Sequence, residues 1–345
     1  MIPLDQINLA IQDLPPYRRA QIYRAVFTNA CDSWEKATDL PADLRARLTE
    51  TAPLAIGSEF FASRDGRTIK ALTRLGDGNY TETVLMQKGD RNTVCVSTQV
   101  GCPMGCVFCA SGKDGLTRNL SFEEIVGQVL LFSRKLRAEG RAVTNVVFMG
   151  IGEPLLNYDN LIAAIRFMNL KDTLNFGARR FSISTCGIAP GIKRLADEST
   201  LAVNLAVSLH STINEKRARL MPAGRNCRTG LLTATLKEYF TKTKRKIMFE
   251  YVLLETNTLR EDALALRDFL NAVNAAYVVN LIPLTKSASG CQAPERRALY
   301  DFKELLTDLG VNHVQRHSFG SDIEAACGQL AGRATASPAP NNNAR

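Results

Sequence analysis

The sequence predicts an α/β fold, with a partial barrel of about six parallel strands preceded by a small helical unit. From Thr93 onward, strand-like segments alternate with helical ones, which is typical of a parallel sheet with right-handed crossovers. About six strand–helix units are fewer than the eight that close a full barrel. The site of such a sheet lies at the carboxyl ends of its strands. The motifs that follow each strand are therefore the candidates for function.

Four regions are predicted along the chain. Residues 1–60 should form a helical accessory domain with helices at 17–27 and 39–48, and 61–92 a β-hairpin extension around the turn signal at 76–78. Residues 93–331 should form the barrel and 332–345, rich in Ala, Pro and Asn, a disordered tail. In the barrel we expect strands at 93–100, 143–149, 180–184, 201–209, 247–254, 277–282 and 311–317, and helices starting at 121 and after 157, and at 260–273 and 294–309.

Composition limits the classes of function. The 345 residues include 43 Lys and Arg against 34 Asp and Glu, a net charge of +9, which suits a polyanionic partner but also an ordinary basic surface. Arg18, Arg19 and Arg24 crowd the first predicted helix, where they could touch phosphate or simply face solvent. The N-terminus lacks the pattern of a signal peptide, and nine cysteines, three of them in one loop, suit a reducing compartment. We expect a cytoplasmic monomer with no membrane partner.

The most informative stretch is a loop after the first barrel strand. Gly101–Cys109 holds Cys102, Cys106 and Cys109 at the spacing C-x3-C-x2-C. A structural zinc site takes four ligands, and a plain iron–sulfur cluster takes four cysteines. Three clustered thiolates therefore indicate a cluster with one iron open to a substrate or cofactor. A zinc site completed by a distant Cys or His, or a chance grouping, remains possible at this point.

The loop resembles the cluster loop of radical S-adenosylmethionine (SAM) enzymes. Its surroundings at 95–102 and 115–120, together with 319–330, resemble the RlmN/Cfr family of RNA adenine methyltransferases, and the likeness covers nearly the whole chain up to the tail. The resemblance implies a partial (β/α)6 radical SAM barrel. It also implies a [4Fe–4S] cluster held by Cys102, Cys106 and Cys109, with SAM on the fourth iron.

A SAM pocket is implied by residues at successive strand ends. Gly150–Pro154 follows the second barrel strand, where glycines let the backbone approach a ligand. The resemblance assigns the pocket to residues after the second, third, fourth and sixth strands: Gly152, Glu153, Ser184, Ser208, Leu209, His210 and Thr285. Thr285 stands where the family has a SAM-binding asparagine, although its hydroxyl could take that contact. A lone histidine such as His210 is by itself more often structural.

Three residues outside these sets acquire roles only through the resemblance. Alone, Cys327 would be a small buried hydrophobe, although Gly328 beside it suggests a mobile loop. Glu82 alone would be a solvent-facing strand residue, and Cys95 a buried strand cysteine. The resemblance implies that Cys327 carries a methyl group, that Cys95 forms a disulfide with it, and that Cys95 or Glu82 accepts a proton.

The implied reaction uses two SAM molecules, an S-methylcysteine, a cellular electron donor and a thiol reductant. Its substrate would be an adenine of rRNA or tRNA. Gly152-Glu153-Pro154 favours methylation at C2, whereas Phe319-Gly-Ser-Asp322 is closer to the sequence of enzymes that methylate C8. Two alternatives stay open: a radical SAM enzyme acting on a small molecule or peptide, and a non-enzymatic zinc- or cluster-containing RNA-binding protein.

Overall fold

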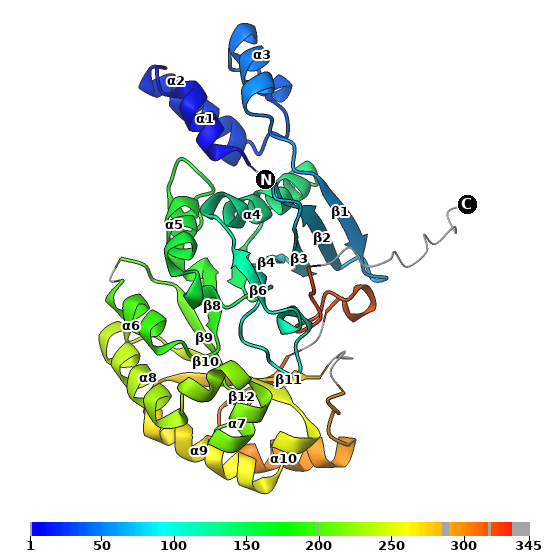
Figure 1. The fold of residues 1–345 in the computed structure, drawn as a ribbon, viewed down its shortest axis with the longest axis vertical. Helices are drawn as coiled ribbons and strands as arrows, with labels where there is room; N and C mark the ends of the chain where they lie inside the picture. The colour runs from blue at the N-terminus through cyan, green and yellow to red at the C-terminus, as the bar shows by residue number, and fades with distance from the viewer. Residues whose placement is uncertain (1, 199, 285–289, 317–318, 333–345) are drawn as a thin grey trace, which may run out of the picture.

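A single large sheet organises the molecule. The computed structural model describes residues 2–198, 200–284, 290–316 and 319–332. In this part of the chain ten strands form one sheet in the order β1-β2-β3-β4-β7-β8-β9-β10-β11-β12, and β5 pairs with β6 separately. Figure 1 shows the helices of the barrel outside the sheet and the N-terminal helices at one end of the long axis.

The elements have the following bounds. The strands are β1 (Ser58–Ala62), β2 (Thr68–Arg74), β3 (Tyr80–Lys88), β4 (Arg91–Cys95), β5 (Gln99–Gly101), β6 (Leu116–Asn119), β7 (Asn145–Phe148), β8 (Phe181–Thr185), β9 (Asn204–Ser208), β10 (Ile247–Leu253), β11 (Tyr277–Pro283) and β12 (His313–Gln315). The α-helices are α1 (Leu4–Ile11), α2 (Pro16–Tyr23), α3 (Ala42–Thr51), α4 (Phe122–Ala138), α5 (Tyr158–Asn169), α6 (Ala189–Asp197), α7 (Asn214–Leu220), α8 (Thr229–Thr243), α9 (Arg260–Val273) and α10 (Arg296–Asp308).

The predicted fold class is confirmed by the strand directions. β4 and β7 to β12 pair in parallel from neighbour to neighbour. β1, β2 and β3 join them as an antiparallel extension, through the pairing of β3 with β4. Parallel neighbours need a crossover between them, and the helices outside the sheet supply it. The carboxyl ends of the parallel strands therefore meet at one edge of the partial barrel.

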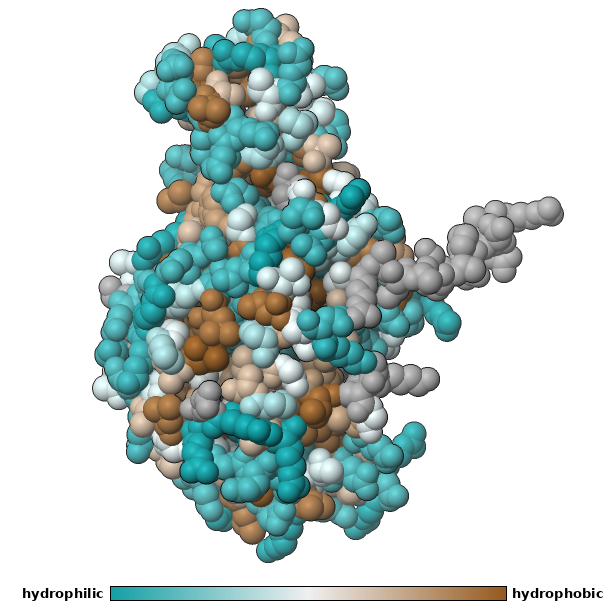
Figure 2. All heavy atoms as spheres, viewed as in Figure 1, coloured by the Kyte–Doolittle hydropathy of each residue, from teal (hydrophilic) through white to brown (hydrophobic). Residues whose placement is uncertain are grey.

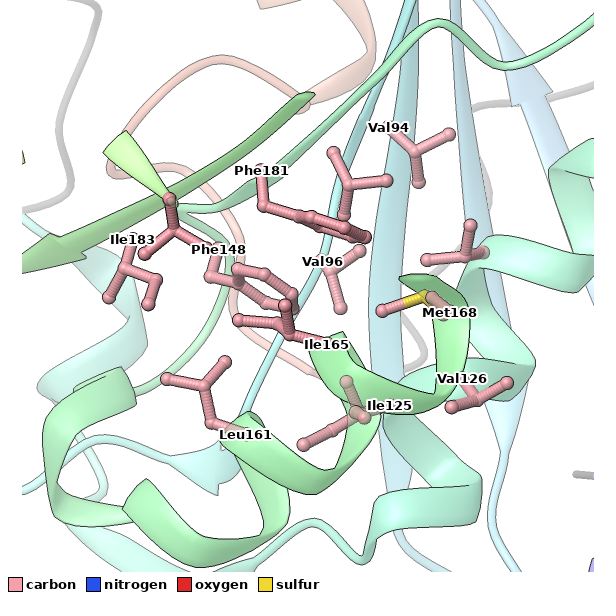
Figure 3. Close-up of a cluster of buried hydrophobic side chains, with 14 of the residues drawn as sticks. Val94, Val96, Ile125, Val126, Phe148, Leu161, Ile165, Met168, Phe181 and Ile183 are labelled. Carbon is pink, nitrogen blue, oxygen red and sulfur yellow. The ribbon is translucent and has the colours of Figure 1, made fainter. Parts of the chain in front are cut away.

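Apolar side chains join the helices to the sheet. Figure 3 shows one such cluster, in which α4 and α5 meet strands β4, β7 and β8. Phe148 and Phe181 stack with their ring centroids 6.3 Å apart, and both are fully buried. Each such side chain contributes about 1.5–3 kcal/mol of hydrophobic free energy. This packing fixes the strands whose far ends carry the site.

The chain leaves the main sheet after Cys95, whereas the sequence predicts one strand over 93–100. Buried amide side chains bind the backbone at this point. Gln128 of α4 accepts from the Ser97 N–H (2.8 Å) and donates to the Ser97 carbonyl (3.0 Å). Asn157 donates to the Thr98 carbonyl (2.8 Å). These contacts satisfy polar backbone groups that strand pairing would otherwise bind, and the chain turns toward the loop of three cysteines.

The N-terminal helices pack on the barrel, and their buried side chains continue its hydrophobic core. Trp34 is buried and its indole N–H donates to the Ala52 carbonyl (2.8 Å). Phe27 meets Phe167 of α5 edge to face, with centroids 5.0 Å apart. Hydrophilic residues cover most of the N-terminal helices in the view of Figure 2. No helix in the described part of the chain is long and apolar enough to cross a membrane.

Candidate functional site

The loop of three cysteines is closed at its base by backbone contacts. β5 pairs with β6, and the Cys102 N–H donates to the Gly115 carbonyl (2.8 Å). Gly101 has a φ of +74°, and a Cβ added there would lie 2.1 Å from the Gly115 oxygen. Only glycine fits such a backbone approach. The closed base directs Cys102, Cys106 and Cys109 into one pocket.

This pocket opens where the parallel strands end. It contains about 960 Å³ of empty space, including its open mouth. Nine residues that the sequence singles out line it: Cys102, Cys106, Cys109, Gly152, Glu153, Ser184, Ser208, His210 and Cys327. Leu209 instead lies in the hydrophobic core, and Thr285 lies outside the described residues. Motifs that are far apart in the sequence therefore meet in one cavity, because they follow the carboxyl ends of the parallel strands.

Glu153 joins the ends of two neighbouring strands. Its carboxylate accepts from the backbone N–H groups of Leu155 (3.1 Å) and Cys186 (2.7 Å). Burial raises the pKa of this carboxyl group, and the two N–H donors partly oppose the shift. Gly152 beside it has a φ of +109°, and a Cβ there would lie 2.7 Å from Gln99. The Gly-Glu motif therefore shapes the pocket wall through close backbone packing and buried hydrogen bonds.

His210 is a neutral histidine in the pocket wall. Its Nδ1 accepts from the Val252 N–H (3.0 Å), so the proton of the neutral ring lies on Nε2. Burial lowers the pKa of His210 to about 3, and the nearby Arg217 adds to this shift. The ring of Phe108, next to the third cysteine of the loop, meets the His210 ring edge to face, with centroids 4.6 Å apart. His210 can therefore donate a hydrogen bond at Nε2 while its Nδ1 fixes the β10 backbone.

Cys327 lies in a segment that docks beside the cysteine loop. The Gly328 carbonyl accepts from the Ala110 N–H (2.7 Å). A Cβ added to Gly328, whose φ is +81°, would lie 3.0 Å from the Phe108 carbonyl oxygen. The sequence suggests a mobile loop here, whereas the structure shows that the glycine permits a close contact. Cys327 is exposed to the pocket yet enclosed by protein, and burial raises the pKa of its thiol.

Cys95 lies beneath the same segment, at the end of β4. It is buried in a small apolar cluster with Val84, Ala325 and Leu330. Burial and, to a smaller extent, the nearby Cys327 raise the pKa of Cys95 to about 12. Cys95 does not appear among the residues that line the pocket. The structure thus places one thiol in the pocket wall and a second behind it, close enough for the two charges to interact.

Glu82 is not the solvent-facing residue that its strand position alone predicts. Its side chain is only 3% exposed. Oε1 forms an ion pair with Lys70 (2.9 Å), and Oε2 accepts from the N–H groups of Ala331 (2.7 Å) and Gly332 (2.8 Å). The C-terminal segment covers this part of β3, because its Ala325 and Leu330 pack in one apolar cluster with Val84 of the same strand. Glu82 does not line the pocket.

Sequence reasoning missed several polar residues of the pocket, among them Arg316, Glu250 and Cys186. Arg316, one residue past β12, pairs with the buried Glu250 of β10 (3.2 Å), and Asn280 donates to the other oxygen of Glu250 (2.8 Å). The charge of Arg316 lowers the pKa of Cys327 against the effect of burial. Cys186, just past β8, shares a hydrogen bond with Cys106 that lowers the pKa of Cys106. An acidic residue inside the apolar strand at 247–253 was the signal that could have drawn attention to Glu250.

Comparison with known proteins decides the family. A model of the radical SAM superfamily matches residues 96–269. A protein from Chloroflexus aurantiacus, named a probable dual-specificity RNA methyltransferase RlmN, is 44% identical over 331 residues, covering 92% of this chain and 88% of that one. This chain belongs to the RlmN family of radical SAM enzymes. A namesake from Dictyoglomus thermophilum is 41% identical over 92% of this chain and 90% of its own length.

A solved structure agrees with this membership in the RlmN family. The crystal structure of a radical SAM methyltransferase from Sphaerobacter thermophilus superposes with a TM-score of 0.89 at 40% identity, covering 95% of this chain and 96% of that one. The sequence-based prediction of a radical SAM methyltransferase is thereby confirmed. Membership of the radical SAM superfamily implies a [4Fe–4S] cluster and SAM.

The donor set of this RlmN family member fits a cluster. In the described ranges, no three His, Cys, Asp or Glu side chains converge as the ligands of a single metal ion would. A cluster needs no such convergence, because each cysteine binds a different iron. Burial raises the pKa of Cys102 to about 12, so iron binding has to displace the thiol proton. Three thiols on one pocket wall, facing strand ends with free space between, suit a cluster with an open iron.

Proposed function

We propose that this chain methylates a ring carbon of adenine in rRNA or tRNA, at C2, and uses Cys327 to carry the methyl group. The named relatives are RNA methyltransferases. The observation that carries the proposal is the position of Cys327, which lines the same pocket as the three loop cysteines while Cys95 lies behind it. A radical SAM enzyme acting on a small molecule or peptide has no need of these two further thiols.

The pocket has one wall for each cofactor. Cys102, Cys106 and Cys109 would hold the [4Fe–4S] cluster, and the facing strand ends would hold SAM through Gly152, Glu153, Ser184, Ser208 and His210. When bound, the cluster and two SAM molecules per turnover supply the methyl group and a radical that removes a hydrogen atom. Phe108 on His210 would shield the cluster from water.

The two cysteines explain how an unreactive carbon could be methylated. The ring carbons C2 and C8 of adenine are electron-poor, so neither attacks a methyl group as a nucleophile. The Cys327 thiolate accepts the methyl group first. Once that methyl group has lost a hydrogen atom, its carbon can bond to the adenine ring and join Cys327 to the RNA through a thioether. Loss of the ring proton, to Cys95 or Glu82, and of one electron, which the bound cluster would accept, restores aromaticity.

Cys95 then completes the cycle. The Cys95 sulfur attacks Cys327 Sγ and the bond from that sulfur to the methylene carbon breaks, with its electron pair left on carbon. The carbon takes up one proton to become the methyl group, and methylated RNA leaves. A cellular thiol reductant reduces the Cys95–Cys327 disulfide, and a cellular electron donor supplies the cluster. The position of Cys95 supports this step, because it packs against Ala325 of the segment that carries Cys327 and its pKa responds to charge on Cys327. We propose that the enzyme works in this way as a cytoplasmic monomer.

Paired cysteine variants test the carrier role. With Cys95→Ala the thioether cannot be resolved, so a covalent protein–RNA adduct should accumulate on denaturing gels. Cys327→Ala should give neither adduct nor product. Cys31→Ala, at a buried cysteine of the N-terminal helices, is the matched control and should behave as wild type. Normal turnover by the Cys327→Ala enzyme would falsify the mechanism.

A further inference from the structure

The segment that carries Cys327 is held in place by contacts to two distant parts of the chain. This segment, residues 319–332, contains only one short helical turn at Ser321–Ile323. On one side the cysteine loop holds it, because Ser111 donates to the Leu330 carbonyl (2.7 Å) and Ala110 to the Gly328 carbonyl (2.7 Å). On the other side the β1–β3 extension holds it. Figure 1 shows the segment between these two regions.

The contact with the extension is built on a buried ion pair. Glu82 Oε2 accepts from both the Ala331 and Gly332 N–H groups, at 2.7 and 2.8 Å. Glu82 Oε1 takes the Lys70 ammonium at 2.9 Å, and the two side chains are 5% and 3% exposed. Lys70 of β2 lies opposite Val84 of β3. It is therefore the diagonal neighbour of Glu82 across this antiparallel pair of strands. The two side chains thus belong to neighbouring strands of the sheet, and Glu82 links them to the backbone of the segment.

Each partner stabilises the other in this buried position. A carboxylate taken out of water is costly unless a cation and hydrogen-bond donors surround it. Lys70 supplies the cation, and the ionised Glu82 then makes two charge-assisted hydrogen bonds, which are stronger than neutral ones. Without Lys70, Glu82 would be buried without its cation and the anchor of the segment would weaken. Lys70 itself is not one of the residues that line the pocket.

A second set of contacts with the same extension holds the first residues of the segment, those that precede Cys327. The Arg64 N–H, in the turn between β1 and β2, donates to Asp322 (2.9 Å). Gly320 lies so close to Thr68 that an added Cβ would come within 2.6 Å of its methyl carbon. The extension therefore touches the segment both before and after Cys327.

We propose that the Lys70–Glu82 pair is a positioning device that fastens the Cys327 segment over the pocket. Lys70 and Glu82 are positioning residues in this role, which rests on the proposed function of Cys327 as methyl carrier. The extension, which lies outside the parallel barrel, exists in part to place this one thiol.

Hydrogen exchange of the cluster-loaded, RNA-free enzyme tests the anchor directly. In Lys70→Met, amides of peptides covering 319–332 should exchange about tenfold faster than in wild type, because a local contact is lost, whereas β7 and β8 should keep their protection. Lys70→Arg retains the charge and should restore slow exchange. Unchanged exchange at 319–332, or equal acceleration in β7 and β8, would overturn the proposal.

A matched variant controls for the loss of any buried ion pair. Lys216 pairs with the buried Asp262 (2.9 Å) on the helices of the barrel, and Lys216→Met should leave exchange at 319–332 unchanged. If Lys70→Met fails to fold, the double variant Lys70→Met/Glu82→Gln replaces it, because it leaves no unpaired charge buried. Amides at 319–332 should exchange faster in this double variant as well. Slow exchange at 319–332 in that double variant would also overturn the anchor.

Peptide mass spectrometry separates this proposal from the function on which it rests. After incubation with SAM, wild-type Cys327 should carry a methyl group, and the methylated fraction at early times should fall severalfold in Lys70→Met and recover in Lys70→Arg. If wild-type Cys327 stays unmethylated, the proposed function fails while the exchange data still decide the anchor. If methylation is equal in all variants, the positioning role is wrong although the carrier role stands.

Discussion

At the scale of single residues, His210 shows how the pocket sets the state of a titratable group. Its ring is buried between Phe108 and β10 and accepts from Val252, and its pKa falls from 6.5 to about 3. The unfolded chain binds a proton on this residue near pH 6.5, whereas the folded chain does not until about pH 3. Stabilisation by the neutral ring is therefore complete above pH 6.5 and is lost as the pH falls toward 3.

A His210→Asn variant tests this dependence. Asparagine keeps an acceptor for the Val252 N–H and tolerates the left-handed backbone at this position, where φ is +55°. Between about pH 6 and pH 4, the free energy of unfolding of the wild type should fall by about 1.4 kcal/mol per pH unit more than that of the variant. Urea unfolding of both cluster-free proteins across this range measures the difference. Parallel curves would show that His210 is not buried in its neutral form.

Residue roles could be predicted only where a motif carries them. The spacing of Cys102, Cys106 and Cys109 and the strand-end positions of the pocket residues were visible in the sequence. The burial of Glu82 was not, because its partners Lys70 and Ala331 come from another strand and from the far end of the chain. Strand periodicity describes which face a residue takes, but it cannot say what covers that face.

At the scale of elements, the cysteine loop depends on one glycine. A Cβ at Gly101 would lie 2.1 Å from the Gly115 oxygen, whereas Gly105, also at positive φ, has nothing within 4 Å of that position. Gly101→Ala should therefore open the base of the loop and sharply reduce iron bound after reconstitution. Gly105→Ala should suffer only the backbone strain, about 1–2 kcal/mol, and keep most of its iron. Iron and sulfide analysis of the two variants compares them, and equal iron content would contradict the account of the loop.

The end of β4 shows why element boundaries were harder to predict than elements. The residues 93–100 are β-like in pattern, yet the sheet pairing stops at Cys95. The deciding contacts come from Gln128 and Asn157, which lie on later segments and bind the backbone at 97 and 98. By contrast, the predicted helix at 260–273 coincides with α9, because its apolar spacing is local.

At the scale of the whole molecule, the alternation of strands and helices was enough to predict the parallel sheet, since a helix between two consecutive strands is the crossover that lets them pair in parallel. The docking of the C-terminal segment on the extension was not predictable, because it joins residues 249 positions apart through a side chain and the backbone. The pocket itself follows from the topology, as the carboxyl ends of parallel strands share one edge.

The charge of the N-terminal helices leads to a prediction for the whole enzyme. Arg19 and Arg24 are exposed, and if they contact RNA phosphates, Arg19→Glu/Arg24→Glu should weaken RNA binding and lower the slope of log affinity against log salt by about 1–2. The exposed Lys237 and Arg260 lie on barrel helices, and their reversal to Glu is the control. Binding titrations at several salt concentrations provide the slopes. If both double variants lost RNA affinity equally, the effect would come from net charge alone and not from a contact of Arg19 and Arg24.

The central claim is tested most directly by nucleoside analysis after reaction in vitro. The reconstituted enzyme is incubated with SAM, a reductant and RNA that lacks the modification, and the digested RNA is examined by mass spectrometry. The account predicts 2-methyladenosine with the wild type and none with Cys327→Ala. Formation of 8-methyladenosine would keep the carrier mechanism but contradict methylation at C2. No methylated adenosine from the wild type, or equal product from Cys327→Ala, would contradict the central claim.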